Sequence, residues 1–246
     1  MKANVTMKAL SAAVLGLAGM AFAGSSMAAC PATATAWTAT VATGGAVTIA
    51  TPGYKSTECR ADSAITANLG SASAFVRDDT PNNEARYRTR FLINVDNLTG
   101  LNSTQPVRIF SATTATPAMS VPEVVRLSVF GNAAGTNKVL GIATACSSSA
   151  TGLCSFTAPL TGGTAGVHTI EIDWQKGTTG SIRVWVNNGT EASPTLNQTV
   201  DNNAWGGVDS AALGLSSASA GFRSAQLNRT VGFDEFDSRR STFIGL

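Results

Sequence analysis

Charged residues are scarce in this sequence, and histidine is almost absent. Asp, Glu, Lys and Arg make up 13% of the 246 residues, and His168 is the one histidine. With a single histidine and cysteines that we expect to be paired, a His/Cys zinc cluster is excluded. A Ser-His-Asp triad would need His168 beside a nucleophile that no motif marks. We therefore expect no metal cluster and no complete catalytic set.

Long apolar runs are also missing outside the first 29 residues, which have the composition of a secretory signal. Lys2 and Lys8 frame the start, an apolar run extends from Ala9 to Ala23, and small residues precede Cys30. An apolar core this short is typical of a cleavable signal and not of a membrane helix. We predict a bacterial signal peptide over 1–29, a secreted or periplasmic mature protein over 30–246, and no integral membrane segment after cleavage.

The predicted mature chain also lacks a net charge. Removing Lys2 and Lys8 from the 17 basic residues leaves 15 basic residues against 15 acidic ones. A neutral chain has no electrostatic footprint for nucleic acid or anionic lipid. The composition thus argues against a nucleic-acid partner.

Four cysteines follow the predicted signal, and their even number in an exported chain predicts disulfides. Their order suggests Cys30 with Cys59 and Cys146 with Cys154, although four cysteines allow three connectivities. One alternative is a lipoprotein acylated at Cys30, because Met27-Ala28-Ala29-Cys30 resembles a lipoprotein signal. Acylation would leave one thiol unpaired, so the disulfide hypothesis is preferred.

Short runs rich in Val, Ile, Phe and Thr alternate with Gly, Asn, Asp, Pro and Ser clusters from Ala46 onward. This punctuation is typical of an all-β sandwich or barrel, and we expect no helix outside the leader. Strands are predicted over 85–95, 107–110, 123–130, 138–142, 170–174, 182–186, 212–215 and 231–236.

Residues 168–187 predict a hairpin that turns over 175–180. Its register pairs Trp174 with Ile182, Ile172 with Val184 and Ile170 with Val186 on a buried face. The same register pairs Asp173 with Arg183 and Glu171 with Trp185 on the other face.

Several segments resemble the core strands of LamG-like, concanavalin A-like modules in secreted bacterial proteins. They are Val76 to Pro81, Glu84 to Arg88, Arg90-Phe91, His168 to Trp174, Val184 to Asn187 and Phe233 to Arg240. This resemblance implies a jelly-roll sandwich of two antiparallel sheets, formed by residues 30–246 as a single domain.

Glu171 and Asp173 are the candidate catalytic residues, because alternate residues of a strand project from one face. Jelly-roll glycoside hydrolases of the laminarinase type use a similar E-x-D-x-x-E strand, but Lys176 stands where their acid/base glutamate would be. Retaining hydrolysis needs two carboxyl groups, one of them held protonated. The favoured interpretation is therefore non-catalytic, with Asp173 paired to Arg183 and Glu171 packed beside Trp185.

Two charged runs predict an ion-pair network between an early and a late strand. Arg86, Arg88 and Arg90 form the basic ladder, and Asp234, Glu235 and Asp237 form its acidic counterpart. An anion site is the less favoured alternative.

The candidate ligand-binding residues are Trp185, Trp205, Arg183 and Asn187, since aromatic faces can stack on sugar rings. Burial under a loop is the competing interpretation for both tryptophans. No cofactor is expected, although loops such as 78–80 and 201–203 leave calcium open.

Three functions follow from these observations. The first is an exported, non-catalytic module for recognition or surface attachment, with a polysaccharide or cell-surface glycan as its partner. The alternatives are a jelly-roll glycoside hydrolase that uses Glu171 and Asp173, and a structural subunit of a surface layer or filament.

Overall fold

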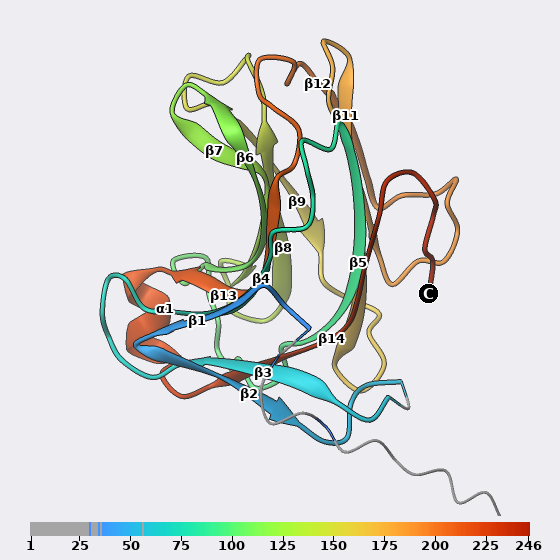
Figure 1. Ribbon diagram of the computed structural model, residues 1–246. Coiled ribbons are helices and arrows are strands. Elements are labelled where there is room, and N and C mark those ends of the chain that lie inside the picture. The colour runs from blue at the N-terminus through green and yellow to red at the C-terminus, as the bar shows by residue number, and fades with distance from the viewer. Residues whose placement is uncertain (1–29, 31–33, 35, 56) are drawn as a thin grey trace, which may run out of the picture.

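Two antiparallel sheets stacked face to face form the protein, as Figure 1 shows for the computed structural model, which describes residues 30, 34, 36–55 and 57–246. In spatial order, sheet A contains β1 (Ala39–Thr43), β4 (Ser73–Asp78), β13 (Ser210–Ala218), β6 (Val107–Ala118), β7 (Val121–Gly131), β8 (Lys138–Ala145) and β9 (Leu153–Pro159). Sheet B contains β12 (Leu196–Val200), β11 (Gly180–Val186), β10 (Val167–Gln175), β5 (Arg86–Asn94), β14 (Thr230–Arg239), β3 (Arg60–Ile65) and β2 (Gly45–Ala50). The predicted jelly-roll sandwich is confirmed.

One continuous core fills the space between the sheets. Alternate residues of each strand point inward, so that Ile170, Ile172 and Trp174 of β10 are at most 1% exposed. The predicted hairpin register is confirmed pair by pair, on both the buried face and the charged face. Burying these aliphatic and aromatic side chains supplies the main stabilisation of the sandwich.

The strand prediction was incomplete at the N-terminal end and in the short edge strands. All eight predicted strands exist, but β1, β2, β3, β4, β9 and β12 were not predicted as separate strands. Most of these carry Ala, Ser, Thr or Gly, whose weak hydrophobic alternation hides the period of two. Edge strands need only one buried face and one neighbour, so a weaker pattern suffices there.

The expectation of no helix outside the leader was wrong in one place. Helix α1 (Ala220–Ala225) connects β13 to β14 and buries Phe222 completely. Its N-cap is Ser219, whose hydroxyl accepts a hydrogen bond from the Phe222 amide at 3.1 Å. A single turn is too short to show helical periodicity in the sequence.

Both predicted disulfides are present, joining Cys30 to Cys59 and Cys146 to Cys154. The Cys30 sulfur that a lipoprotein anchor would use is therefore occupied by a disulfide. Two disulfides fit an extracellular protein. Within the described residues, no helix has the length and apolar character needed to cross a membrane. The predicted signal peptide lies outside the described residues.

Sheet A is curved, and its outer face is concave. In Figure 1 the β6–β7 hairpin and the end formed by β1 and α1 both project to the same side of the middle of the sheet. The outer face of sheet B lies on the opposite side of the molecule. The two outer faces thus offer two separate surfaces.

Candidate functional site

The outer face of sheet B holds the predicted carboxylates, but both are enclosed by arginines. Glu171 and Asp173 are each 2% exposed. Arg86 binds Asp173 through two hydrogen bonds of 2.9 and 2.8 Å, and Arg183 also donates to Asp173. The Nε of Arg88 donates to Glu171 at 2.6 Å. The predicted pairing of Asp173 with Arg183 is therefore confirmed.

The contacts of Asp173 favour its ionised form at neutral pH. Burial alone would raise the pKa of Asp173, but the hydrogen bonds from Arg86 and Arg183 outweigh it, so the pKa lies below its ordinary value. A general acid needs the opposite shift. The arrangement suits a structural ion-pair network better than acid catalysis.

The C-terminal segment covers this face. The backbone amides of Ile244 and Gly245 donate to the two oxygens of Glu171 at 3.0 and 2.8 Å. The guanidinium of Arg88 is flanked by the Trp185 ring at 4.8 Å and the Phe243 ring at 4.7 Å. Trp185 is consequently only 1% exposed, so its predicted role in ligand binding would require this segment to move.

The other predicted ligand residues are also held in internal contacts. Trp205 is 1% exposed and donates from Nε1 to the Val121 carbonyl at 3.0 Å. The Asn187 side chain accepts from the Thr169 amide, donates to the Thr161 carbonyl and contacts the buried ring of His168. Arg183 lies over the Trp185 ring at 5.3 Å. A ligand role for these four residues stays a prediction.

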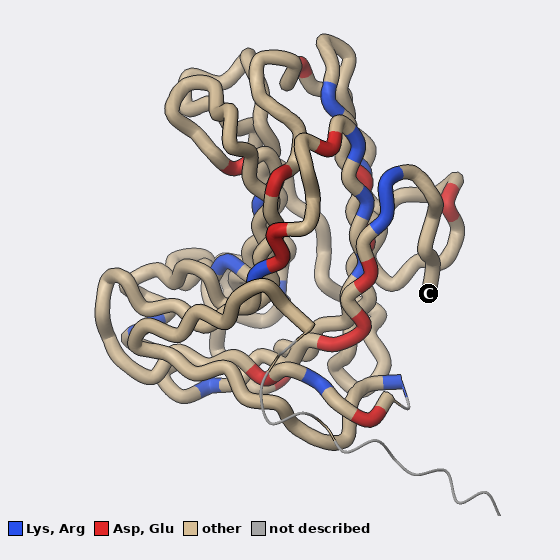
Figure 2. Tube along the Cα trace, viewed as in Figure 1, with Lys and Arg blue, Asp and Glu red and all other residues tan. Residues whose placement is uncertain are grey.

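The arginine ladder pairs differently from the prediction. Arg86 and Arg88 bind β10, and only Arg90 reaches the late strand, where it contacts Glu235 at 3.0 Å. The prediction is confirmed for Arg90 and wrong for Arg86 and Arg88, because the sequence did not show that β5 lies between β10 and β14, with acidic residues on both sides. Figure 2 shows the resulting alternation of basic and acidic positions along this side of sheet B.

The concave face of sheet A carries a different constellation, arranged in one row across the strands. The cross-strand pairs place side by side Arg77, Ala212, Ser111, Arg126, Ala143 and Ser155. The three small residues Ala212, Ser111 and Ala143 are 5–9% exposed yet lie outside the core. Ala212 and Ser111 lie between Arg77 and Arg126, whereas Ala143 follows Arg126 in the row, so only short side chains separate the two arginines.

Arg126 is the free cation of this row. Among the described residues it forms no ion pair, whereas its neighbour Arg108 binds Glu123 at 2.7 Å and Arg77 binds Asp79 at 2.9 Å. Burial lowers the pKa of Arg108, with Glu123 opposing this shift and the positive charge of Arg126 adding to it. An anionic group bound here would relieve the repulsion between the two arginines.

No metal centre emerges from the part of the chain that the structure describes, because no three His, Cys, Asp or Glu side chains lie together. In the two loops considered for calcium, each aspartate accepts a hydrogen bond from the backbone amide two residues later. Thr80 donates to Asp78, and Asn203 donates to Asp201. These are ordinary Asx turns. Calcium binding remains an untested prediction.

Several solved structures share this fold, among them two lyases and a cellulose-induced protein. An endo-β-1,4-glucuronan lyase from the fungus Trichoderma reesei is 10% identical, with a TM-score of 0.60, covering 83% of this chain and 91% of its own. The cellulose-induced protein Cip1 is 19% identical at a TM-score of 0.53, covering 83% and 89%. An alginate lyase solved with alginate trisaccharide is 10% identical at 0.52, covering 74% and 82%.

The likeness to these structures is one of fold alone: a concanavalin-like jelly-roll sandwich. Neither the known protein families nor the curated protein sequences contain a match to this chain. The LamG-like resemblance stated from the sequence therefore has no family match behind it. Any function must be argued from this chain's own residues.

Sequence reasoning missed Arg77, Arg108 and Arg126. A signal for Arg126 was available, since apolar Val125 and Leu127 flank it and consecutive residues of a strand point to opposite faces. What the sequence did not show is that β4 and β7 belong to the same concave sheet, with only β13 and β6 between them. Arg77 and Arg126 therefore looked unrelated.

Proposed function

We propose that this protein is an exported polysaccharide-binding module that holds an acidic glycan on the concave face of sheet A. The observation that carries the proposal is the row from Arg77 to Arg126, with only Ala212 and Ser111 between them. This pattern combines charge at two points with a floor of small side chains.

The chemistry of uronic acids matches this row. A guanidinium recognises a carboxylate through two parallel hydrogen bonds, which gives orientation as well as affinity. Three strand spacings separate β4 from β7, about 14 Å at the usual distance between strands. A glycan lying across the strands would therefore meet Arg126 directly and Arg77 by exchange of its exposed contact with Asp79, at separate sugar units. Two structural neighbours, a glucuronan lyase and an alginate lyase, are named for acidic polysaccharides of the same class.

The non-catalytic form of the proposal is supported by the enclosure of Glu171 and Asp173. Both carboxylates are saturated by arginines and, for Glu171, by backbone amides. The hydrolase alternative needs these groups free. Export rests on the predicted signal peptide over 1–29 and on the two disulfides, and the single LamG-like domain over 30–246 belongs to the same proposal.

The decisive experiment compares acidic and neutral polymers on the mature protein. Isothermal titration with polyglucuronate and alginate should give binding that weakens as salt is added, because exposed charges are screened. Arg126→Gln should weaken that binding about tenfold or more, since a charge-assisted hydrogen bond contributes about 1.5–3 kcal/mol. Neutral β-glucan should bind less well on this face.

A matched control is Arg229→Gln, which removes the same charge at an exposed position just before β14 of sheet B. Equal affinity of Arg126→Gln and the unaltered protein would refute the proposal, as would the absence of binding to either acidic polymer at low salt. The same incubations should be assayed for new reducing ends. Cleavage that disappears in Glu171→Gln would establish the enzymatic alternative instead.

A further inference from the structure

A separate opening lies between the two layers, beside the end of β4 and the middle of β14. It encloses about 470 Å³ and is lined by both sheets and by the segment that carries Trp37. This volume falls within the usual range for small-molecule sites. A smaller opening of about 150 Å³ adjoins it, and Thr80 lines both. We call the two together the mouth.

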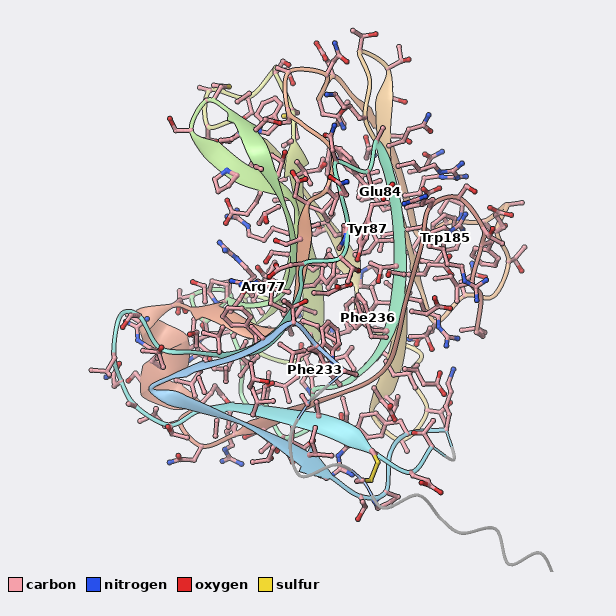
Figure 3. All side chains as sticks on the ribbon, in the orientation of Figure 1. Arg77, Glu84, Tyr87, Trp185, Phe233 and Phe236 are labelled. Carbon is pink, nitrogen blue, oxygen red and sulfur yellow. A yellow bond between two sulfur atoms is a disulfide. The ribbon has the colours of Figure 1, made fainter. Side chains whose placement is uncertain are left out.

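Aromatic side chains form one wall of the mouth. The rings of Trp37 and Phe236 are 4.7 Å apart and tilted by 52°. Phe236 is turned inward by a β-bulge, because the pairing of β14 with β5 shifts by one residue between Asp234 and Asp237. Figure 3 shows Phe236 and Tyr87 between the layers, whereas Trp185 lies on the other side of sheet B.

Tyr87 supplies an unused polar group in the smaller opening. Its side chain lines that opening, the residue is only 4% exposed, and its hydroxyl has no hydrogen-bond partner among the described residues. The hydroxyls of Ser238 and Thr89 lie beside it without the geometry of a hydrogen bond. Burial raises the pKa of Tyr87, so the hydroxyl stays protonated and can donate. A buried hydroxyl without a partner is costly unless a ligand or water satisfies it.

Two carboxylates at the mouth also have an oxygen that can accept a hydrogen bond from a ligand. Asp78 uses Oδ1 for the Thr80 amide, which leaves Oδ2 with no described partner. Glu84 Oε1 accepts a hydrogen bond from Arg240 at 2.7 Å, and Glu84 Oε2 likewise has no described partner. Carboxylates repel an anionic ligand, and no lining cation in the smaller opening is free, since Arg239 and Arg240 bind Asp237 and Glu84.

We infer that the mouth binds a neutral sugar unit, a ligand class distinct from the acidic glycan assigned to sheet A. A pyranose ring offers an apolar face for Trp37 and Phe236. Its hydroxyl groups both donate and accept, so they match the free oxygens of Asp78 and Glu84 and the hydroxyl of Tyr87. The disulfide of Cys59 with Cys30 fastens the segment that brings Trp37 to this place.

Tryptophan fluorescence of the mature protein reports on this site. Trp174, Trp185 and Trp205 are at most 1% exposed, whereas Trp37 is partly buried at the mouth. Titration with cellobiose, maltose and lactose should give a saturable change with at least one of these disaccharides, and Trp37→Phe should abolish that change. Isothermal titration gives the affinity independently of the fluorophore.

Tyr87→Phe is the sharpest variant, because it removes one hydroxyl that has no hydrogen-bond partner among the described residues. The urea concentration at the midpoint of its unfolding should not fall. The affinity for the disaccharide should drop about 2- to 10-fold, which corresponds to the net free energy of one hydrogen bond. Tyr54→Phe, the other tyrosine of the chain, should leave the affinity unchanged.

Three results would overturn the inference. They are no binding of any neutral disaccharide, equal affinity in Tyr87→Phe, and loss of binding in Arg126→Gln with no loss in Tyr87→Phe. The last result would move the ligand to sheet A. Failure of acidic polymers to bind would reject the function proposed for sheet A without affecting this site.

Discussion

Arg88 shows how single residues organise the outer face of sheet B. Its side chain is completely buried, yet it contacts Glu171 and Glu191 at 2.6 and 2.8 Å and lies between two aromatic rings. Removing one partner of a buried ion pair leaves an uncompensated buried charge. This destabilises the fold far more than removing one partner of a surface pair does. The network therefore fixes the positions of β5 and β10 more firmly than its surface location suggests.

Asp173 makes this network sensitive to acid. Its folded pKa lies below the unfolded value of about 4, so the stabilisation is present above that pH and is lost as the pH falls through the folded pKa. Urea unfolding should give a free energy of unfolding that declines below about pH 4.

Asp173→Asn should remove part of this acid sensitivity. At neutral pH it should cost up to about 3 kcal/mol, because Arg86 and Arg183 would lose their shared partner. An identical pH profile in the variant would show that other carboxyl groups carry the acid response. Asp201→Asn, at a site without an ion pair among the described residues, is the control.

At the scale of elements, the C-terminal segment behaves as a cover and not as a core strand. Beneath it lie charged groups, Glu171, Arg88 and Arg90, in addition to Trp185. Charged groups can be hydrated when uncovered, whereas a core face cannot. The segment should therefore be separable from the sandwich.

Deletion of residues 242–246 should leave the β-sheet circular dichroism spectrum unchanged. The loss of partly buried Phe243 and Ile244 should cost about 1–3 kcal/mol. Trp185 should become accessible to quenching by acrylamide, and Phe243→Ala should give an intermediate effect. Unchanged quenching would mean that the loop after β11 covers Trp185 by itself.

The bulge in β14 illustrates how one element serves two surfaces. Glu235 adopts a positive φ of 48° and reaches Arg90 on the outer face, while Phe236 turns into the mouth. In a regular strand, alternation from the inward-facing Phe233 would turn Glu235 inward and Phe236 outward, and the extra residue reverses this. The bulge therefore links the ion-pair network to the opening between the layers.

For the whole molecule, the two disulfides should contribute unequally. They close loops with sequence separations of 29 and 8 residues. In the chain-entropy model these correspond to about 3.6 and about 2.5 kcal/mol. Replacing Cys30 and Cys59 by serine should lower the melting temperature more than replacing Cys146 and Cys154. The reverse order would show that the shorter bridge acts chiefly on the native loop.

Much of the fold was predictable because local patterns carry it. The alternation in residues 85–95 and 170–186 set the buried faces, and cross-strand matching of polarity set the hairpin register. The candidate site was less predictable. Trp185 and Trp205 carry ring faces suited to sugars, but their burial depends on segments distant in sequence, namely 243–246 and the β6–β7 hairpin.

By itself, the sequence determined the all-β class and the side of each strong strand that faces the core. The order of its cysteines only suggested the two disulfide pairs that the structure contains, and the signal peptide over 1–29 stays a prediction. A side-chain period of two is a local property, so it can be followed along the chain without knowing the neighbours. Only the tertiary structure decided that Arg77 and Arg126 share a concave row, and that Trp37, Phe236 and Tyr87 surround one opening. Strand order is set by contacts between segments far apart in sequence, and no local pattern records which segments will become neighbours.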